Sequence, residues 1–388
     1  KLIYNNGKVH GKIVKWYENG NIWYTSEFHN GVKNGIHKIY YMNGLIKDST
    51  QFVNGKEHGK FYSFKPDGTK ESEGYFKMGQ EDSTWIWYNK GFVRIKGTFK
   101  NSLRHGTWLF NYPGTNKKEH IAFFKNGLKE GTWKYFYESG GKLRVANFKN
   151  DKRNGKWSVY FENGKLDHEG KFKDDKEHGV WTSWYEKNER VNEKGSFNMG
   201  VMDGKWEGFY DNGNQKFIAN YDNGIKQGEY IKFYPNGRVG IKETYSNGLL
   251  EGKYEAYYDK GFFVREKGQY KLIKPTIDRV RNKIDTVIVN KNGDTLKIEK
   301  DPLIKFREKQ KESVKDGLWI VYFDGTNIPY QKINYVNGRL SGVFITYYSN
   351  GKPQSKIIYQ NGRKNGISKF YDKNGKVIKK TKYIMDNI

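Results

Sequence analysis

Histidines and carboxylates are the residues of this chain that could bind a metal or transfer a proton. Three of the eight histidines, His58, His105 and His178, stand directly before a glycine that recurs through the chain. Carboxylates recur in the same manner, since Glu18 and Glu138 each lie two residues before a turn glycine. A metal centre or an acid–base pair needs a unique convergent cluster, which repeated single residues do not supply. We therefore predict no catalytic residue, no metal site and no cofactor.

Other catalytic chemistries lack their sequence signatures. The chain contains no cysteine, which excludes disulfides, thiolate metal sites and cysteine nucleophiles. Gly-Lys pairs such as Gly155-Lys156 are not followed by a helical pattern, so they do not form a phosphate-binding loop. Serines near histidines have no strand–turn–helix context of the kind that exposes a hydrolase nucleophile. We expect a protein that is not an enzyme and has no small-molecule substrate.

The chain is strongly basic. Its 70 Lys and Arg against 43 Asp and Glu give a net charge of +27, which favours anionic partners. Most of the excess is lysine spread along the whole chain, however, and lysine also protects exposed strands from aggregation. The charge alone leaves both interpretations open.

A glycine, called the anchor glycine below, recurs about every 24 residues. The steps between successive anchors are 23 to 25 residues, apart from one of 65, and a serine occupies the fourth position. A fixed period of this length is typical of repeat proteins, in which each unit rests on its neighbours. The anchors are Gly11, Gly35, Gly59, Ser83, Gly106, Gly131, Gly155, Gly179, Gly204, Gly228, Gly252, Gly317, Gly342 and Gly366.

Aromatic residues keep fixed distances from the anchor. Eleven of fourteen repeats have one two residues after it, thirteen of fourteen have one five residues after it, and a further column lies seven residues before it. Matching columns in consecutive repeats are what a stacked sheet needs for its core. The predicted core ladder comprises Trp108, Trp133, Trp157, Trp181, Trp206, Phe124, Phe148 and Phe172.

The spacing inside one repeat is that of β-strands. Trp133 and Tyr135 alternate with Thr132 and Lys134, a period of two that places neighbours on opposite faces. Asn-Gly pairs close the runs, as at 126–127, and both residue types accept positive φ. We predict an all-β fold: an elongated, single-layer antiparallel β-meander or solenoid of about fourteen 24-residue hairpin repeats with one insertion.

The repeated pattern Tyr-x-Asn-Gly, followed by Gly-x-Trp-x-x-Tyr-Tyr, resembles the MORN repeat in its bacterial variant. The resemblance covers residues 1–271 and 315–388, and every repeat carries it. It implies stacked β-hairpins and a role in scaffolding, protein binding or membrane association. Bacterial members of the family are often described as antitoxin components, which implies inhibition of a protein partner as a further alternative.

Residues 272–314 interrupt the pattern and form a basic insert. Its middle contains Asn292-Gly293 between two apolar runs, which predicts a hairpin. Unique insertions often carry the specificity of a repeat array, although a tolerated surface loop would have the same sequence character. The residues that we predict to contact a partner are Arg279, Arg281, Lys283, Lys291, Lys297, Lys305 and Arg307.

These features predict a scaffold that binds another protein. The alternative is an anionic surface, either acidic lipid or nucleic acid, bound through the lysine-rich ladder. Aromatic columns interleaved with lysine do resemble surfaces that bind single-stranded nucleic acid. The same columns are also required by the core of a stacked sheet, so they do not favour nucleic acid by themselves.

The first residue and the length of the apolar runs bear on the cellular location. The chain starts at Lys1 rather than Met, as a processed protein would. No apolar run approaches the ~18 residues of a membrane-spanning helix. We expect a bacterial cell-envelope protein, periplasmic or associated with the outer membrane, with a cytoplasmic protein as the alternative.

Overall fold

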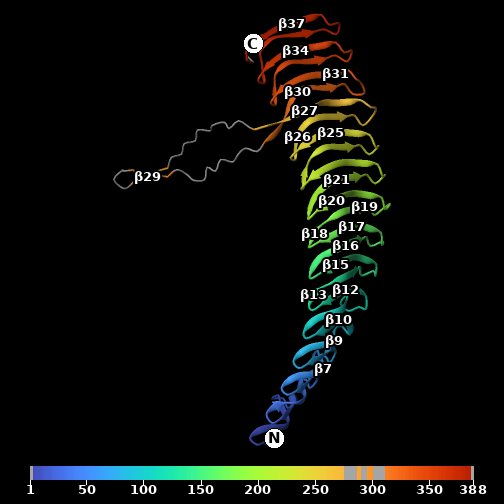
Figure 1. The fold of residues 1–388 in the computed structure, drawn as a ribbon, viewed down its shortest axis with the longest axis vertical. Coiled ribbons are helices and arrows are strands. Elements are labelled where there is room, and N and C mark those ends of the chain that lie inside the picture. The colour runs from blue at the N-terminus through green and yellow to red at the C-terminus, as the bar shows by residue number, and fades with distance from the viewer. Residues whose placement is uncertain (1–2, 275–285, 290–294, 300–310, 386–388) are drawn as a thin grey trace. The chain divides into compact units, whose positions relative to one another are not determined.

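The structure is a computed structural model that describes residues 3–274, 286–289, 295–299 and 311–385. These residues form strands and turns, and the described ranges contain no helix. The chain divides into two compact units, an N-terminal unit (Lys1–Val201) and a C-terminal unit (Met202–Ile388). Within each unit, strands that are consecutive in sequence lie side by side (Figure 1).

The strands of the N-terminal unit follow one another at short intervals. They are β1 (Ile3–Asn5), β2 (Lys8–Trp16), β3 (Ile22–His29), β4 (Val32–Lys33), β5 (Gly35–Tyr40), β6 (Ile46–Val53), β7 (Lys56–Phe64), β8 (Lys70–Lys77), β9 (Gln80–Asn89), β10 (Phe92–Lys100), β11 (Leu103–Asn111), β12 (Lys118–Lys125), β13 (Leu128–Lys129), β14 (Gly131–Phe136), β15 (Lys142–Lys149), β16 (Lys152–Tyr160), β17 (Leu166–Lys173), β18 (Lys176–Glu177), β19 (Gly179–Trp184) and β20 (Val191–Asn198).

The remaining strands repeat this order. They are β21 (Val201–Phe209), β22 (Gln215–Asp222), β23 (Ile225–Lys226), β24 (Gly228–Phe233), β25 (Val239–Ser246), β26 (Leu249–Tyr257), β27 (Val264–Ile273), β28 (Thr286–Val289), β29 (Thr295–Glu299), β30 (Glu312–Tyr322), β31 (Pro329–Val336), β32 (Arg339–Leu340), β33 (Gly342–Tyr347), β34 (Pro353–Gln360), β35 (Arg363–Lys364), β36 (Gly366–Tyr371) and β37 (Val377–Tyr383).

The topology is an antiparallel meander, as the sequence predicted. Each long strand pairs with the next long strand along the chain, as β14 does with β15 and β15 with β16. Thirty-five strands belong to one sheet, and β28 and β29 form a separate hairpin at the insert. The predicted fold class is confirmed.

Two kinds of turn alternate along each unit. In the first, both residues of an Asn-Gly pair adopt positive φ, as Asn126 (51°) and Gly127 (84°) do. The second turn is longer: the Tyr17 amide donates to the Asn21 carbonyl at 2.8 Å, and Gly20 has a φ of 86°. Both residues of the Asn-Gly pair therefore take positive φ in the first kind of turn. In the second, as at Gly20, the extra residues let glycine adopt the left-handed conformation while the preceding Asn19 does not.

The anchor glycine marks a bulge in the strand. Phe124 pairs with Lys129 and Ile121 pairs with Lys134, so three steps along β12 face five steps along β13 and β14. The anchor of this repeat, Gly131, has a φ of 66°. Ser83, the one anchor that is not glycine, has a φ of 60°. Glycine recurs here because the bulge needs a left-handed residue.

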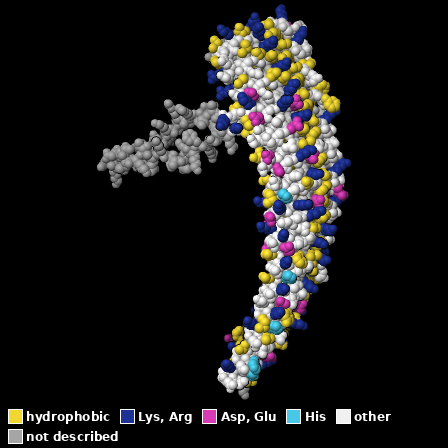
Figure 2. Space-filling model, in the orientation of Figure 1, with side chains coloured by type: hydrophobic (Ala, Val, Ile, Leu, Met, Phe, Trp, Pro, Cys, Tyr) yellow, Lys and Arg dark blue, Asp and Glu magenta, His cyan; other side chains and the backbone are white. Residues whose placement is uncertain are grey.

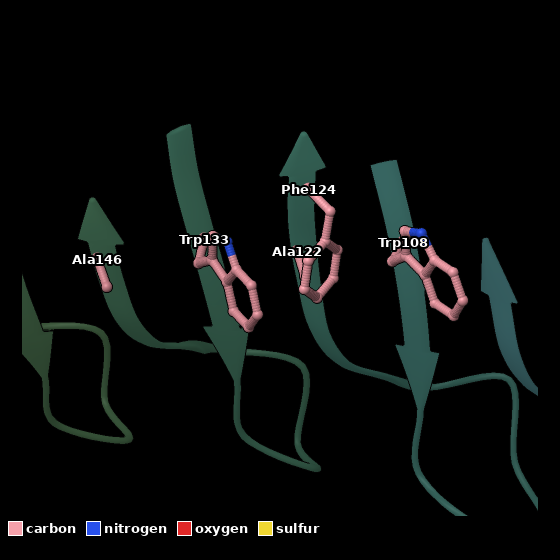
Figure 3. Packing of buried hydrophobic residues seen from close by; sticks show 5 residues of the cluster. All are labelled: Trp108, Ala122, Phe124, Trp133 and Ala146. Carbon is pink, nitrogen blue, oxygen red and sulfur yellow. The ribbon is translucent and has the colours of Figure 1, made fainter. Parts of the chain in front are cut away.

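The core of each unit lies on one face of its sheet, where indoles cover small residues of the neighbouring strand. Trp108, Phe124 and Trp133 pack along consecutive strands with Ala122 between them (Figure 3). The Phe124 and Trp133 ring centroids are 5.2 Å apart in an edge-to-face contact, the geometry that aromatic quadrupoles favour. A Cβ on Gly97 would lie 2.1 Å from the Trp108 ring. The small residue is therefore required by the indole that covers it.

Candidate binding surfaces

Side chains of each repeat alternate between two faces of the sheet. The tryptophan face carries the residues two and four after the anchor, and seven and nine before the next anchor; Trp108 and Ala122 are a cross-strand pair on it. The lysine face carries the residues one, three and five after the anchor, and eight and ten before the next anchor; Leu109 and Ile121 are a pair on this face. Each face therefore presents a different repeated surface to solvent.

The tryptophan face is filled by its own rings. Of the eight predicted ladder residues, five are buried and three are partly buried: Trp108, Trp133, Trp206, Phe124 and Phe172, then Trp157, Trp181 and Phe148. The Trp108 Nε1 donates to the Thr98 carbonyl at 3.2 Å, and the Trp133 Nε1 donates to the Phe123 carbonyl at 3.1 Å. Because rings and donors are both engaged within the sheet, this face serves as the core of each unit.

Cations cover many of these rings, a feature that sequence reasoning missed. The Arg104 guanidinium lies 4.7 Å from the Trp108 ring centroid and 5.2 Å from that of Phe124. The Lys315 Nζ lies 3.8 Å from the Trp319 centroid. The available signal was a basic residue four positions before the tryptophan. Part of the positive charge thus stabilises the core through cation–π contacts and is not free for a partner.

A row of tyrosine hydroxyls joins successive repeats and was also missed. Where the residue six after the anchor is tyrosine, its hydroxyl can donate to a carbonyl of the next repeat, as Tyr112 does to Phe136 at 2.8 Å and Tyr137 to Tyr160 at 2.7 Å. The Tyr258 hydroxyl donates to the Tyr322 carbonyl at 3.1 Å, although 64 residues separate them. The second tyrosine of each Tyr-Tyr pair therefore links two successive repeats by a hydrogen bond, and such bonds also occur after the insert.

The histidines do not converge. His10, His58, His105 and His178 each have a buried Nδ1 atom without a hydrogen-bond partner in the part of the chain that the structure describes. The described residues contain no group of three or more His, Asp or Glu that could hold a metal ion. The His120 ring stacks on Phe110 with centroids 4.0 Å apart. These histidines occupy positions in the sheet and do not assemble a centre.

Burial lowers the pKa of two histidines. His37 has a lowered pKa because it is partly buried and because the charge of Lys33 lies nearby. The pKa of His120 is lowered by burial, with Arg94 and Arg144 acting in the same direction and Glu119 opposing them. Both rings are therefore held neutral in the folded chain at pH values where an exposed histidine begins to charge.

The insert begins later than the sequence indicated. Leu272 pairs with Ser313, and Ile273 pairs with Glu312, so the hairpin of β27 and β30 extends into the predicted insert. The insert takes the place of a two-residue Asn-Gly turn at the end of this hairpin.

The predicted partner-contacting residues all fall in this insert. Lys297 lies in β29, whose side chains are not described. The others lie outside the described residues: Arg279, Arg281, Lys283, Lys291, Lys305 and Arg307. Their role in binding remains a prediction.

The lysine face combines exposed aliphatic residues with lysines that lean over tyrosines. The Lys332 Nζ lies 5.7 Å from the Tyr347 ring centroid, and the Lys356 Nζ lies 5.9 Å from that of Tyr371. In five repeats an aliphatic residue directly after the anchor is about half exposed: Ile36 (50%), Val180 (53%), Leu318 (52%), Val343 (45%) and Ile367 (53%). The described residues contain no helix that could cover this face. It is the surface of the sheet that offers apolar area to a partner.

None of the described residues form a helix that is long and apolar enough to cross a membrane.

Solved structures with similar segments belong to much larger chains. The crystal structure described as TcdB2-TccC3-TEV shares 11% identity over 97% of this chain, with a TM-score of 0.16. A structure of the Photorhabdus luminescens Tc holotoxin pore shares 10% identity over 96% of this chain, with a TM-score of 0.15. This chain spans 23% and 26% of the two matched chains. Among curated proteins, no match to the sequence was found.

A family model described as the MORN repeat variant matches six segments of the sequence. The matched residues are 9–30, 129–150, 153–174, 202–223, 340–361 and 364–385. Each segment covers one repeat of the meander, and MORN repeats are associated with binding to proteins or membranes. The resemblance seen in the sequence is confirmed: both compact units of this chain carry MORN repeats of the variant type.

Proposed function

We propose that this chain is a non-enzymatic scaffold that docks another protein on the lysine face of its sheet. The observation that carries the proposal is the aliphatic residue after the anchor, which is about half exposed in five repeats. Three of the five, Leu318, Val343 and Ile367, belong to consecutive repeats, and exposed apolar area on neighbouring strands commonly marks an interaction site. Apolar residues in consecutive repeats offer a partner an extended surface.

The polar groups of the repeats support a role other than catalysis. Glu73 accepts a hydrogen bond from the Tyr88 hydroxyl and forms an ion pair with Lys70 at 2.9 Å. Both interactions lower the pKa of Glu73. Burial and this hydrogen bond raise the pKa of Tyr88 to about 12. Such carboxylates and phenols are held in fixed protonation states at neutral pH, whereas a general acid or base needs a pKa near the working pH.

We further propose that the insert contributes to partner selection. It replaces a tight turn between β27 and β30, so it departs from the repeat at a point where the sheet itself is complete. The Tyr258 to Tyr322 hydrogen bond fastens the repeats on either side of it. The repeats can therefore tolerate changes in this segment, which is a condition for a specificity element.

The test is a pull-down with the wild-type chain and a variant in which residues 274–311 are replaced by Asn-Gly. This junction keeps the Ile273–Glu312 pair and copies the turn at Asn126-Gly127. The variant should melt near the wild-type temperature and lose the main protein partner. Retention of every partner would place recognition on the repeats alone. If nothing but nucleic acid or lipid, released by added salt, is recovered with the wild-type chain, the protein-scaffold proposal fails.

The cell-envelope location is proposed alongside this function. Fractionation of the native host would test it, since a pool confined to the cytosol would contradict it.

A further inference from the structure

Three lysines lie directly opposite one another on the lysine face of the C-terminal unit. Lys356 of β34 pairs with Lys369 of β36, and Lys369 pairs with Lys380 of β37. Residues directly opposite in an antiparallel pair have Cβ atoms about 4.5–5.5 Å apart, and like charges there destabilise the sheet. The sequence therefore maintains an arrangement that costs stability.

Elsewhere in the chain, lysines in the same cross-strand row have acidic or neutral partners. Further back in the C-terminal unit, Glu255 stands between Lys242 and Lys267 and pairs with both. In the N-terminal unit, two lysines of this row have neutral partners on both sides. Lys38 pairs with Thr25 and Ser49, and Lys134 pairs with Ile121 and Val145. The run of three lysines departs from the pattern of both units.

Acidic residues do not offset the lysine run. Residues 337–385 contain eleven Lys and Arg and a single acidic residue, Asp372. The Asp372 carboxylate accepts hydrogen bonds at 2.9 Å from the amides of Asn374 and Lys376, within its own turn. Among the residues that the structure describes, the side chains of Lys369 and Lys380 have no ion pair or hydrogen bond, and both are exposed.

An apolar strip runs beside these lysines on the same face. Val343 and Ile358 pair across β33 and β34 and are 45% and 37% exposed. Ile367 of β36 is 53% exposed and lies two residues before Lys369. Figure 2 shows Lys and Arg side chains among hydrophobic ones at this end of the unit. The surface thus has a basic row next to an aliphatic row.

We propose that this surface, Val343, Ile358 and Ile367 with Lys356, Lys369 and Lys380, docks an acidic protein segment in which carboxylates alternate with apolar side chains. The inference rests on the proposed scaffold function and names the partner's chemistry. Carboxylates over the three lysines relieve their mutual repulsion, and apolar side chains cover the exposed aliphatic strip. The segment crosses strands β33 to β37.

A nucleic acid fits this surface less well. Bases bind single-strand platforms by stacking on open aromatic faces. On this face Lys332 and Lys356 lie over the Tyr347 and Tyr371 rings, so those faces already hold a cation. The aliphatic strip also has no counterpart in a phosphate backbone.

The experiment measures binding of the full chain to a fluorescent peptide of alternating Glu and Val, by anisotropy at low salt. The test variant carries Lys356→Thr, Lys369→Thr and Lys380→Thr. The matched control carries Lys38→Thr, Lys134→Thr and Lys194→Thr, which removes the same charge from the same row of the N-terminal unit. The test variant should bind the peptide about tenfold more weakly or worse, and the control should bind as wild type does.

Melting of both variants separates binding from folding. The test variant should melt no lower than wild type, because two like-charge pairs are removed. A peptide of alternating Glu and Ser should bind wild type more weakly than the Glu-Val peptide, since it cannot cover the aliphatic strip. Equal losses in test and control variants would overturn the proposal, as would tighter binding of oligothymidylate or phosphatidylserine vesicles than of the peptide.

The pull-down described above keeps the two proposals distinguishable. If the test variant still captures the same protein partner as wild type, the lysine-row site is overturned while the scaffold function stands. If wild type binds the peptide as expected but captures no protein, the scaffold function fails and the acidic-segment site remains supported.

Discussion

The two compact units share one backbone pattern but differ in what they place on it. All eight histidines belong to the N-terminal unit, and Figure 2 shows histidine side chains over that unit on the visible face. The C-terminal unit has none. It holds instead the run of opposed lysines at Lys356, Lys369 and Lys380. The tryptophan face is similar in both, since Trp108 and Trp319 are each 1% exposed.

The fold constrains the tryptophan face more strongly than the lysine face. Anchor glycine, indole and small residue depend on one another, because the bulge needs positive φ and the indole needs a neighbour without bulk. The lysine face is free of that requirement and varies between units. Sequence differences on it are therefore informative about binding, whereas those on the tryptophan face are informative about stability.

Loss of a buried tryptophan should lower stability more than any other change, and it should do so in both units. Trp108→Ala and Trp319→Ala should each lower the free energy of unfolding by about 3–5 kcal/mol, since each leaves a cavity in a filled face. Trp23→Ala is the control, because Trp23 is 44% exposed; it should cost about 1 kcal/mol or less. Denaturant unfolding gives the energies, and hydrogen exchange shows which unit opens. A much smaller cost at Trp319 than at Trp108 would show that the cores of the two units are not equivalent.

Acidic pH should have an intermediate effect on stability, and this effect should be confined to the N-terminal unit. His37 and His120 have lowered folded-state pKa values, so the unfolded chain binds their protons more readily than the folded chain. Their contribution to stability is complete above pH 6.5 and is lost as the pH falls through the folded-state values. Hydrogen exchange should therefore show that the N-terminal unit opens more readily at about pH 5.5 than at about pH 7.5, with little change in the C-terminal unit. These two pH values lie on either side of the ordinary histidine pKa.

His37→Phe is the matched variant for the acid effect. It places at this position the aromatic type found in eleven of the fourteen repeats. It should reduce the acid sensitivity of strands β5 and β6. Equal acid sensitivity of both units would mean that carboxylates, not histidines, control it.

The smallest effect concerns the lysine run. Lys369→Thr removes two like-charge pairs and should raise the free energy of unfolding by about 0.2–1 kcal/mol. Lys134→Thr removes a lysine that has neutral neighbours and should change it little. Added salt should shrink the gain at Lys369, because screening weakens the repulsion. A loss of stability at Lys369 would show that the lysine is engaged favourably in the sheet.

Much of the fold could be predicted because its signals are local and repeated. The 24-residue spacing, the alternation around Trp133 and the Asn-Gly pairs each report on a few neighbouring residues. The assignment of faces was harder. Trp157 and Trp181 look equivalent to Trp108 in sequence, yet they are less buried, since burial depends on the side chains of adjacent repeats.

The neighbours of surface side chains could not be predicted from such local signals. Which lysines face each other depends in part on the two-residue bulge shift at the anchor Gly366, which places Lys356 opposite Lys369. The contact of Arg104 with the Phe124 ring and the hydrogen bond from the Tyr112 hydroxyl to the Phe136 carbonyl likewise join positions 20 and 24 residues apart. The predicted contacts at Arg279 and the other insert residues stay predictions.

We propose that the lysine face docks an acidic protein through Lys356, Lys369 and Lys380. Carbodiimide cross-linking joins a lysine amine directly to a carboxylate, so applying it to the full chain in native extract tests the claim at residue level. Mass spectrometry should map the cross-links to Lys356, Lys369 and Lys380 on this chain and to Asp or Glu of a single partner protein. Cross-links concentrated on isolated lysines such as Lys38 and Lys134, or spread evenly over the chain, would contradict it.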